Sequence, residues 1–486
     1  MVYLACIIAY LVLLGAIAIW KSRAVKDQSD FAVAGRSLSP WMMVCTMLAV
    51  WIGTGSIVGN AEQTYETGMA AMLLPIATLV GMALLSLIAT RARNIEASTV
   101  PEIIERRFGP VTRNLAMVSL VVAYMVIVSY QFNAGGAVLE VIVGDTTILT
   151  ARTATLIAAA FIITYAALAG LMSLAWMDLV TGSIIMLTML IALPIYWFKA
   201  GGWSGIETAF MADQRASHLD LWGVYTPTQL VNYILPVFLL VLGDANQYQR
   251  IFASRSGKGA RTAVTLMIFI AFAVELLIIA CAWITSSMTP DPEHGKYILI
   301  YAARHYLALP LGCLFMVTVV AIIISTATSF LHVPATSVVN DLYLPYINPN
   351  ASQKHIVWVS RGFVIVFGVV AYFVTLMFSE STGFFQKALY AFTIYGACIT
   401  PSLVAALVWE RATKQGAIAS MCAGAIVTIG WNEAGFVRQE LPAAIADLDA
   451  VLPAITLSIT MLVAVSLLTR PSKPLTEQPP AEPTNG

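Results

Sequence analysis

Long apolar stretches separated by short polar segments make up most of the chain. A helix that spans a membrane needs about 20 predominantly apolar residues. Thirteen stretches come close to or reach this length: 3–20, 41–61, 69–90, 114–140, 153–169, 178–198, 229–248, 262–286, 309–335, 357–379, 384–409, 412–431 and 450–469. The pattern therefore predicts an all-α integral membrane protein with 13 transmembrane helices, whose two ends lie on opposite sides of the membrane.

The composition agrees with this pattern. Hydrophobic residues make up 59% of the 486 residues and charged residues 11%, and the mean hydropathy is +0.82. Soluble proteins carry about 25% charged residues, so little of the chain is left for a soluble domain, and membrane lipid is the expected surrounding. The formal net charge of zero argues against nucleic acid as a partner. The six cysteines show no CxxC spacing and are expected to pack as small apolar residues.

The distribution of basic residues predicts which end faces the cytoplasm. If the N-terminus is outside, 19 of the 26 Lys and Arg residues fall in inner segments. Cytoplasmic loops carry such an excess, so we expect a multi-pass protein of the cell's inner (plasma) membrane with its N-terminus outside and its C-terminus in the cytoplasm. The Pro-rich tail 470–486 is expected to be disordered and cytoplasmic. The outer loops 199–228 and 287–308 are long enough to hold short interfacial helices that act as lids.

The second predicted helix is interrupted by small residues. Its sequence LAVWIGTGSIVGNAE, residues 48–62, contains Gly53, Gly55 and Gly59 at the depth expected for the middle of the membrane. Such residues can serve close helix packing. Alternatively the helix unwinds here, and non-helical backbone at this depth is tolerated only where it is buried in protein or lines a cavity. We favour the second interpretation.

The seventh predicted helix is interrupted in a similar way by GDANQYQR, residues 243–250, after Pro236. A carboxylate such as that of Asp244 is costly inside a membrane and is usually functional. The alternative is an interfacial position, where Asp244 pairs with Arg250 or Arg255.

Paired interruptions at corresponding positions are typical of inverted-repeat transporters. The expected arrangement is one membrane domain, residues 1–469, that contains two five-helix repeats. The repeats cover residues 41–198 and 229–409, and the flanking helices are 3–20, 412–431 and 450–469.

A dense set of hydroxyl groups lies in the ninth predicted helix. The stretch AIIISTATS, residues 321–329, carries Ser325, Thr326, Thr328 and Ser329. Hydroxyls in a membrane helix can bond to their own preceding turn, but neutral oxygens and carboxylates are also the ligands of hard cations. Asp178, at the start of the sixth predicted helix, is either a carboxylate that favours the helix N-terminus or a charged partner for such a cation.

Several segments, taken together, resemble the sodium:solute symporter family over nearly the whole chain. They are FAVAGRSLSP (31–40), TVPEIIERRFG (99–109), YAALAGLMSLAWMD (165–178), NQYQR (246–250) and STATSFLHVPATSVVNDLY (325–343). Ala169 stands where the family usually has a second glycine before Gly170. The resemblance implies a LeuT-like five-plus-five inverted repeat with broken helices, alternating access and sodium (Na+) as the coupling ion.

The resemblance also implies the residues that bind sodium. A first site would use the backbone carbonyls of Ala49, Ile52 and Ile322 and the hydroxyls of Ser325 and Thr326. Some family members are similar in having a further sodium site, and here Asp178, Ser325, Thr328 and Ser329 match its pattern. The stoichiometry, one or two sodium ions, stays open.

The solute is expected beside the breaks, near the middle of the membrane. Residues expected to face it are Trp51, Gly55, Ser56, Tyr124, Asp244 and Gln247. The segment AVWIGTG looks like that of choline transporters in the family, and Trp51 would offer an aromatic face to a quaternary ammonium. Amino acids and carboxylates are equally compatible, so the expected partner is a small organic solute, carried by a monomer.

Other functional classes have little support in the sequence. An enzyme is not expected, because the chain has no HExxH motif, and GTGS at 53–56 is not a nucleophile elbow. A sensor on the same fold usually needs an output domain, which the short tail does not supply. The closest alternative is a uniporter or channel that moves solute without sodium.

Overall fold

The computed structural model describes residues 2–22, 27–143, 150–377, 383–433, 448–472 and 475. Within these residues the chain is helical, and the extended segments contribute one isolated bridge between Leu38 and Ser254. The α-helices are α1 (Val2–Ser22), α2 (Gln28–Val33), α3 (Pro40–Trp51), α4 (Asn60–Thr67), α5 (Ile76–Asn94), α6 (Val100–Phe108), α7 (Pro110–Val143), α8 (Ala151–Leu168), α9 (Leu171–Lys199), α10 (Gly202–Ala212), α11 (Pro227–Gly243), α12 (Ala245–Ala253), α13 (Gly257–Ser287), α14 (Ile298–Tyr306), α15 (Leu309–Val338), α16 (Gln353–Met377), α17 (Phe384–Cys398), α18 (Thr400–Val408), α19 (Lys414–Glu433) and α22 (Val451–Leu468). Shorter 3-10 or π turns are η1 (Ala34–Arg36), η2 (Gly55–Gly59), η3 (Gly68–Leu73), η4 (Ala216–Leu219), η5 (Pro292–Tyr297) and η6 (Val339–Ile347).

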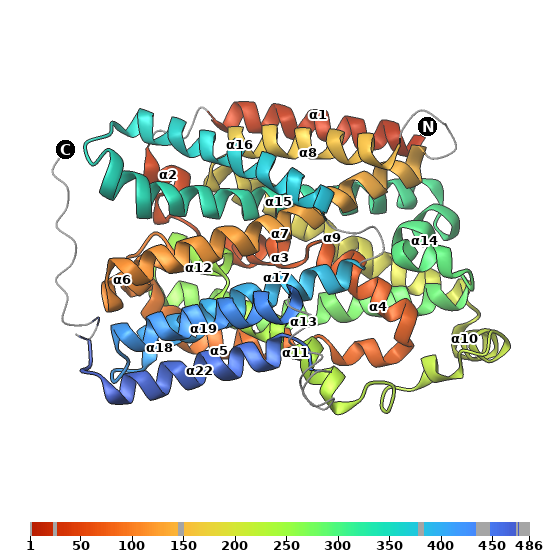
Figure 1. The fold of residues 1–486 in the computed structure, drawn as a ribbon. Helices are drawn as coiled ribbons and strands as arrows, with labels where there is room; N and C mark the ends of the chain where they lie inside the picture. The colour runs from red at the N-terminus through yellow and green to blue at the C-terminus, as the bar shows by residue number, and fades with distance from the viewer. Residues whose placement is uncertain are drawn as a thin grey trace.

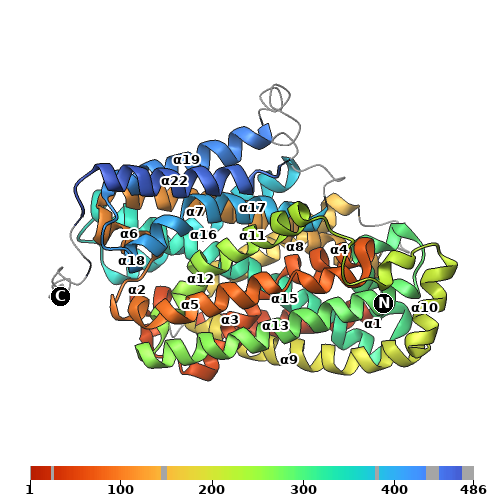
Figure 2. The same cartoon turned by 90° about the horizontal axis from the view of Figure 1, so that it is seen from below.

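The long helices run roughly alongside one another and form an elongated bundle (Figures 1 and 2). The short helices α10 and α14 lie at one end, where α1 begins, and α2 and α6 lie at the other. The last described residues reach the α6 end, because Arg107 of α6 donates to the carbonyl of Ser472. The start of α1 and the end of α22 therefore lie at opposite ends of the bundle. Which end faces the cytoplasm stays a prediction from the basic residues.

All 13 predicted stretches contain helix, but the number of membrane spans is not settled by the helices. Nine helices in the described part of the chain are long and apolar enough to cross a membrane, and ten if the bent pair Pro40–Trp51 and Gly55–Leu73 is one span. Val2–Ile17 and Arg152–Leu168 are apolar but shorter. The count of 13 spans and the internal repeat stay predictions.

Both predicted interruptions are present, with different shapes. The helix axis bends by 55° between α3 and Gly55–Leu73. At the second interruption α11 ends at Gly243 and α12 begins at Ala245, yet Pro227–Ala253 forms one candidate span. The first break therefore redirects the chain, whereas the second interrupts the helix around a single residue.

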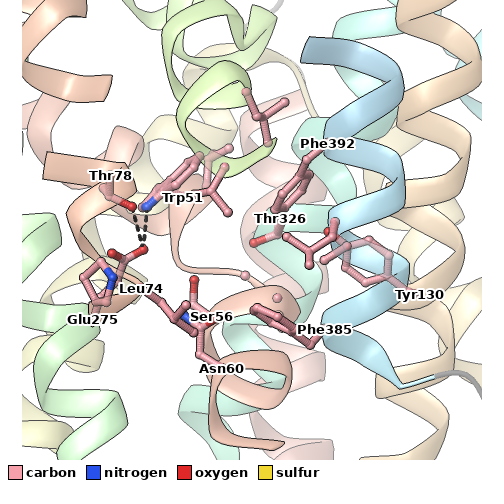
Figure 3. A pocket seen from close by; sticks show the side chains of 18 of the residues that line it. Trp51, Ser56, Asn60, Leu74, Thr78, Tyr130, Glu275, Thr326, Phe385 and Phe392 are labelled. Atoms are coloured by element: carbon pink, nitrogen blue, oxygen red, sulfur yellow. Dashed lines mark hydrogen bonds between the residues drawn. The ribbon is translucent and has the colours of Figure 1, made fainter. Parts of the chain in front are cut away.

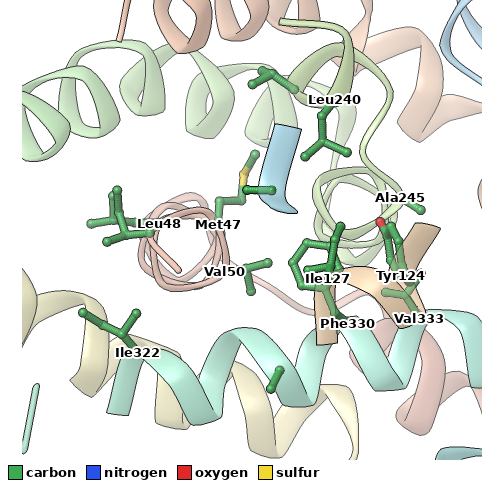
Figure 4. Close-up of a cluster of buried hydrophobic side chains, with 14 of the residues drawn as sticks. Met47, Leu48, Val50, Tyr124, Ile127, Leu240, Ala245, Ile322, Phe330 and Val333 are labelled. Atoms are coloured by element: carbon green, nitrogen blue, oxygen red, sulfur yellow. The ribbon is translucent and has the colours of Figure 1, made fainter. Parts of the chain in front are cut away.

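The core lies between the broken helices and their neighbours. Figure 4 shows apolar side chains from five elements gathered there: Met47, Leu48 and Val50 of α3, Tyr124 and Ile127 of α7, Leu240 of α11, Ala245 of α12, and Ile322, Phe330 and Val333 of α15. These side chains are buried. Such packing holds α3 and α15 side by side, which brings the interrupted segment of the first to the hydroxyl-rich segment of the second.

The two loops predicted to face outside contain the short helices expected of them. Loop 199–228 forms α10 and η4, and loop 287–308 forms η5 and α14. Their role as lids stays a prediction. The expected disorder of the tail concerns residues that lie, apart from 470–472 and 475, outside the described part.

Candidate functional site

The first break is made where α3 loses its helical backbone at Ile52, which has φ −77° and ψ 88°. The next residue has to be very small, because a Cβ atom on Gly53 would lie 2.9 Å from Cγ2 of Thr326. The close approach of backbone and α15 thus explains one of the three glycines. The non-helical backbone at Ile52 and the 55° bend show that the helix is broken here, so the glycines do not serve close packing of an unbroken helix.

Two hydroxyls of α15 approach one carbonyl of α3. The Ala49 carbonyl oxygen lies 3.5 Å from Oγ of Ser325 and 3.4 Å from Oγ1 of Thr326. All three residues are buried. These separations are long for hydrogen bonds between a hydroxyl and an oxygen, which are about 2.5–3.0 Å.

The Ser325 hydroxyl has only one proton, and it lies 2.5 Å from Oδ1 of Asp178, to which it donates. Its approach to the Ala49 oxygen therefore brings two electron-rich oxygens together with no proton between them. A hard cation bound by oxygens at about 2.4 Å holds neighbouring ligands about 3.4 Å apart when they lie at right angles. The spacing and the neutral donors fit a sodium ion. Ile52 ends α3, and Ile322 lies one turn before Thr326 on α15.

Asp178 lies within α9 rather than at its start. The helix begins at Leu171, so Asp178 is about two turns inside it, and the helix-dipole interpretation of this carboxylate does not hold. The side chain is fully buried and accepts hydrogen bonds from Ser325 and from Thr46 Oγ1, each at 2.5 Å.

The guanidinium of Arg250 stands beside Asp178. Its Nη2 is 3.6 Å from Oδ2 of Asp178 and donates to Oγ of Ser329 at 2.8 Å, and its Nε lies 3.3 Å from Oγ1 of Thr46. Arg250 is fully buried, as is Asp178. A buried charge needs a partner of opposite sign, and in this arrangement each residue supplies it for the other. The guanidinium of Arg250 thus lies beside Asp178 and Ser329, where a second sodium ion was expected.

Thr328 points elsewhere. Its hydroxyl donates to the carbonyl of Ile324 at 2.6 Å, within its own helix, which is the local bonding that hydroxyls in membrane helices commonly make. Of the four residues expected around a second sodium, Ser325 contacts Asp178 directly, Ser329 is linked to it through Arg250, and Thr328 has a local partner.

The second break is closed by protein groups. Oδ1 of Asp244 accepts hydrogen bonds from the hydroxyl of Tyr124 at 2.5 Å and from the backbone N–H of Asn246 at 3.1 Å. Tyr395 donates to the carbonyl of Gly243 at 2.8 Å and accepts from the N–H of Ala245 at 3.1 Å. Asp244 therefore caps α12, and Tyr395 bonds to the backbone on both sides of the break, while Oδ2 of Asp244 has no hydrogen-bond partner.

A cavity opens beside the first break. Figure 3 shows Ser56, Asn60, Thr326 and aromatic rings around it. Its lining residues are Val50, Trp51, Gly53, Gly55, Ser56, Asn60, Leu74, Pro75, Thr78, Tyr130, Gln131, Tyr233, Val237, Leu240, Glu275, Thr326, Phe330, Phe385, Ala388, Leu389 and Phe392. The empty space, counted together with the open solvent at its mouth, is about 690 Å³.

The structure divides the six residues expected at the solute. Trp51, Gly55 and Ser56 line this cavity. Tyr124 and Asp244 are absent from its lining and bond to each other at the second break, and Nε2 of Gln247 lies 3.5 Å from the carbonyl of Met47. The first three residues therefore lie at the first break, and Tyr124 and Asp244 lie at the second.

Glu275 is a lining residue that the sequence analysis missed. It lies in α13, and Trp51 Nε1 and Thr78 Oγ1 donate to its Oε1 at 2.8 Å and 3.1 Å (Figure 3). The signal was available, because a carboxylate inside the apolar stretch 262–286 is as unusual as Asp244 in its own stretch.

The model of the sodium:solute symporter family matches residues 31–424. The chain belongs to this family. A high-affinity proline transporter (PutP) of Bacillus subtilis is 27% identical over 94% of this chain and 96% of its own. A sodium/proline symporter of Escherichia coli is 24% identical over 88% of this chain and 86% of its own. A sodium/glucose cotransporter of Vibrio parahaemolyticus is 23% identical over 85% of this chain and 82% of its own.

Solved structures of transporters share the fold of this family member. The structure of a sodium-coupled sialic acid symporter in a substrate-bound, outward-open state covers 97% of this chain and 98% of its own, with a TM-score of 0.80 at 14% identity. The complex of MhsT with L-phenylalanine covers 89% of this chain and 98% of its own, with a TM-score of 0.58 at 12% identity. The predicted family and the all-α membrane transporter fold are confirmed, and the relatives are transporters rather than enzymes.

Proposed function

We propose that this member of the sodium:solute symporter family carries a small organic solute across the plasma membrane together with sodium, by alternating access. The observation that carries the proposal is the position of Thr326. Its hydroxyl approaches the Ala49 carbonyl at the first break, and the same residue lines the cavity. Thr326 would therefore contact both the sodium ion and the solute.

The coupling follows from differential binding. A sodium ion between Ala49, Ser325 and Thr326 pulls the broken segment of α3 against α15, with the carbonyls of Ile52 and Ile322 as further ligands. This contact between α3 and α15 fixes the shape of the cavity beside Gly53. A ligand shifts a conformational equilibrium only as far as it binds one state better. Because Thr326 contacts both sites, binding of the ion raises the affinity for the solute, and binding of the solute raises the affinity for the ion by the same factor.

The proposal includes one sodium ion per solute. Arg250 balances the charge of Asp178, so a second sodium at Asp178, Ser325, Thr328 and Ser329 would require the guanidinium to leave. The solute proposed first is proline, because relatives in two bacterial species carry that name. The proposed orientation has the N-terminus outside and the C-terminus in the cytoplasm, and the proposed unit is the monomer.

The test is uptake of radiolabelled proline into proteoliposomes that contain the purified protein. An inward sodium gradient should drive accumulation above the outside concentration, and an inward potassium gradient should not. Equal flux in both gradients, without accumulation, would identify a uniporter or channel and overturn symport. If proline is not taken up, a thermal-shift screen of solutes with and without sodium identifies the solute, because a ligand that binds the folded state raises its melting temperature.

A further inference from the structure

Glu275 carries an oxygen atom that the protein does not use. The side chain is 3% exposed, and both donors that reach it, from Trp51 and Thr78, bind Oε1. Oε2 has no hydrogen-bond partner. A neutral glutamine could orient Trp51 equally well through its amide oxygen, so the need to hold the indole does not explain a carboxylate here.

The described lining of the cavity contains one carboxylate and no positively charged residue. Among the residues that line it, Glu275 is the single Asp, Glu, Lys, Arg or His. A buried carboxylate is costly unless it is paired with a positive charge. The lining, as far as the structure describes it, supplies no such positive charge.

The opposite wall has the complementary character. Figure 3 shows Glu275 and Thr326 on opposite sides of the cavity. Beside Thr326 lies Gln131, which accepts a hydrogen bond from Thr54 through Oε1 and whose amide Nε2 has no partner. That wall thus offers an unused N–H donor next to the proposed sodium position, and the Glu275 wall offers an unused acceptor.

We propose that Glu275 recognises a positively charged nitrogen of the solute, and that the solute class is a small amino or imino acid bound as its zwitterion. The ammonium group pairs with Oε2 of Glu275, and the carboxylate faces Gln131 and the sodium side. The aromatic rings of Trp51 and Phe392 cover the apolar part in between. This proposal rests on the proposed symport, and it makes Glu275 the residue that excludes solutes without a charged nitrogen.

The experiment measures binding to the purified full chain in nanodiscs, with sodium present, by thermal shift. The probes are proline, tetrahydrofuran-2-carboxylate, which replaces the charged nitrogen with an oxygen, and glucose. Proline should bind at least about ten-fold more tightly than tetrahydrofuran-2-carboxylate, because the analogue leaves Glu275 unpaired. A screen of the other amino acids, each against its N-acetyl derivative, extends the comparison if proline is not the solute.

The variants are Glu275→Gln, Glu275→Asp and, as a matched control, Glu207→Gln, which removes an exposed carboxylate of α10. Glu275→Gln should weaken amino-acid binding by about ten-fold or more and reduce the preference over the nitrogen-free analogue to near unity. Glu275→Asp should keep part of the preference, and Glu207→Gln all of it. The shift caused by sodium alone checks that each variant is folded and keeps its ion site.

The two levels of the proposal fail differently. Absence of any sodium-induced shift or sodium-driven uptake in the wild type would overturn the proposed symport. A normal sodium response with equal binding of proline and its nitrogen-free analogue, or with glucose as the solute that binds, would overturn the role of Glu275 alone. Should Glu275→Gln fail to fold, the comparison of probes on the wild type still decides.

Discussion

The two broken helices release backbone groups in the membrane and satisfy them by different means. At the second break, Asp244 and Tyr395 bond directly to the freed backbone around Ala245. At the first break, the Ala49 carbonyl oxygen lies 3.5 Å from the hydroxyl oxygen of Ser325 and 3.4 Å from that of Thr326. At the second break, protein groups bond the freed backbone, whereas at the first break we propose that a cation does so.

The difference suggests a division of labour. A break closed by short hydrogen bonds between protein groups keeps its shape, because each bond holds two elements together. A break closed by an ion can open when the ion leaves. We therefore expect the α3 segment to respond to sodium and the α11–α12 junction to act as a fixed frame for it.

The largest expected effect concerns Asp178, which connects the two regions through Ser325 on one side and Arg250 on the other. Asp178→Asn leaves the buried guanidinium without a counter-charge, so we expect a loss of about 3–5 kcal/mol of stability in thermal or denaturant unfolding in detergent. Asp213→Asn is the control. It breaks a partly exposed pair with Arg215 and should cost less than about 1 kcal/mol.

The same Asp178 variant tests the number of ions. With Arg250 as the internal cation, the sodium:solute ratio measured from reversal potentials in proteoliposomes should be one in the wild type and in any folded Asp178→Asn protein. A wild-type ratio of two that falls to one in the variant would show that Asp178 binds a second sodium during transport.

A smaller effect is expected at the second break. Asp244→Ala removes the cap of α12 and leaves the Tyr124 hydroxyl unpaired, which should cost about 2–3 kcal/mol. The sodium concentration for half-maximal thermal stabilisation should stay within about two-fold of the wild type. A much larger change in sodium dependence would mean that the second break also belongs to the ion site, and the contrast between the two regions would be lost.

At the first break the expected effect is on ion affinity. Thr326→Ala and Ser325→Ala should each raise the sodium concentration for half-maximal uptake by about ten-fold, equivalent to about 1.4 kcal/mol, because each removes one ligand oxygen. Thr318→Ala on the same helix is the control, since its hydroxyl bonds to Leu314 in its own turn and to Thr188 of α9 rather than to α3. Unchanged sodium dependence in both site variants would contradict the first sodium site.

The smallest effect concerns a contact between η4 and α4, the helix that follows the first break. His218 of η4 contacts the carbonyl of Tyr65 on α4 at 2.9 Å, and burial lowers the pKa of His218 below its ordinary value of 6.5. The unfolded chain therefore takes up this proton first, so the contribution of His218 to stability is complete above about pH 6.5 and is lost as the pH falls below that value. The melting temperature should drop more on acidification in the wild type than in His218→Phe. Parallel curves would show that the pKa of His218 is the same in the folded and unfolded states.

Much of the fold could be read from local properties of the chain. Apolar stretches indicated where helices lie, and glycines or a buried aspartate indicated where two of them break. The density of hydroxyls at 325–329 indicated which helix faces the first break. Each of these is a property of consecutive residues, since helix formation and membrane insertion depend on the local balance of apolar and polar groups.

The sequence alone could not assign roles to the charged and polar residues of the membrane segments. It grouped Tyr124 and Asp244 with Trp51, although they lie at separate breaks, and it passed over Glu275. The oligomeric state, the orientation in the membrane and the internal repeat likewise stay predictions. They concern how the chain sits relative to other copies and to the membrane, and how its two halves correspond.

By itself, then, the sequence determined the family, the membrane character and the two interruptions. Only the tertiary structure decided that Arg250 stands at Asp178, that Tyr395 closes the second break, and that Glu275 faces the cavity opposite Thr326. The reason is physical: a residue's type sets which charge or hydrogen bond it brings, but its partner is chosen by how helices from distant parts of the chain pack, and in a low-dielectric interior that choice decides what the residue does.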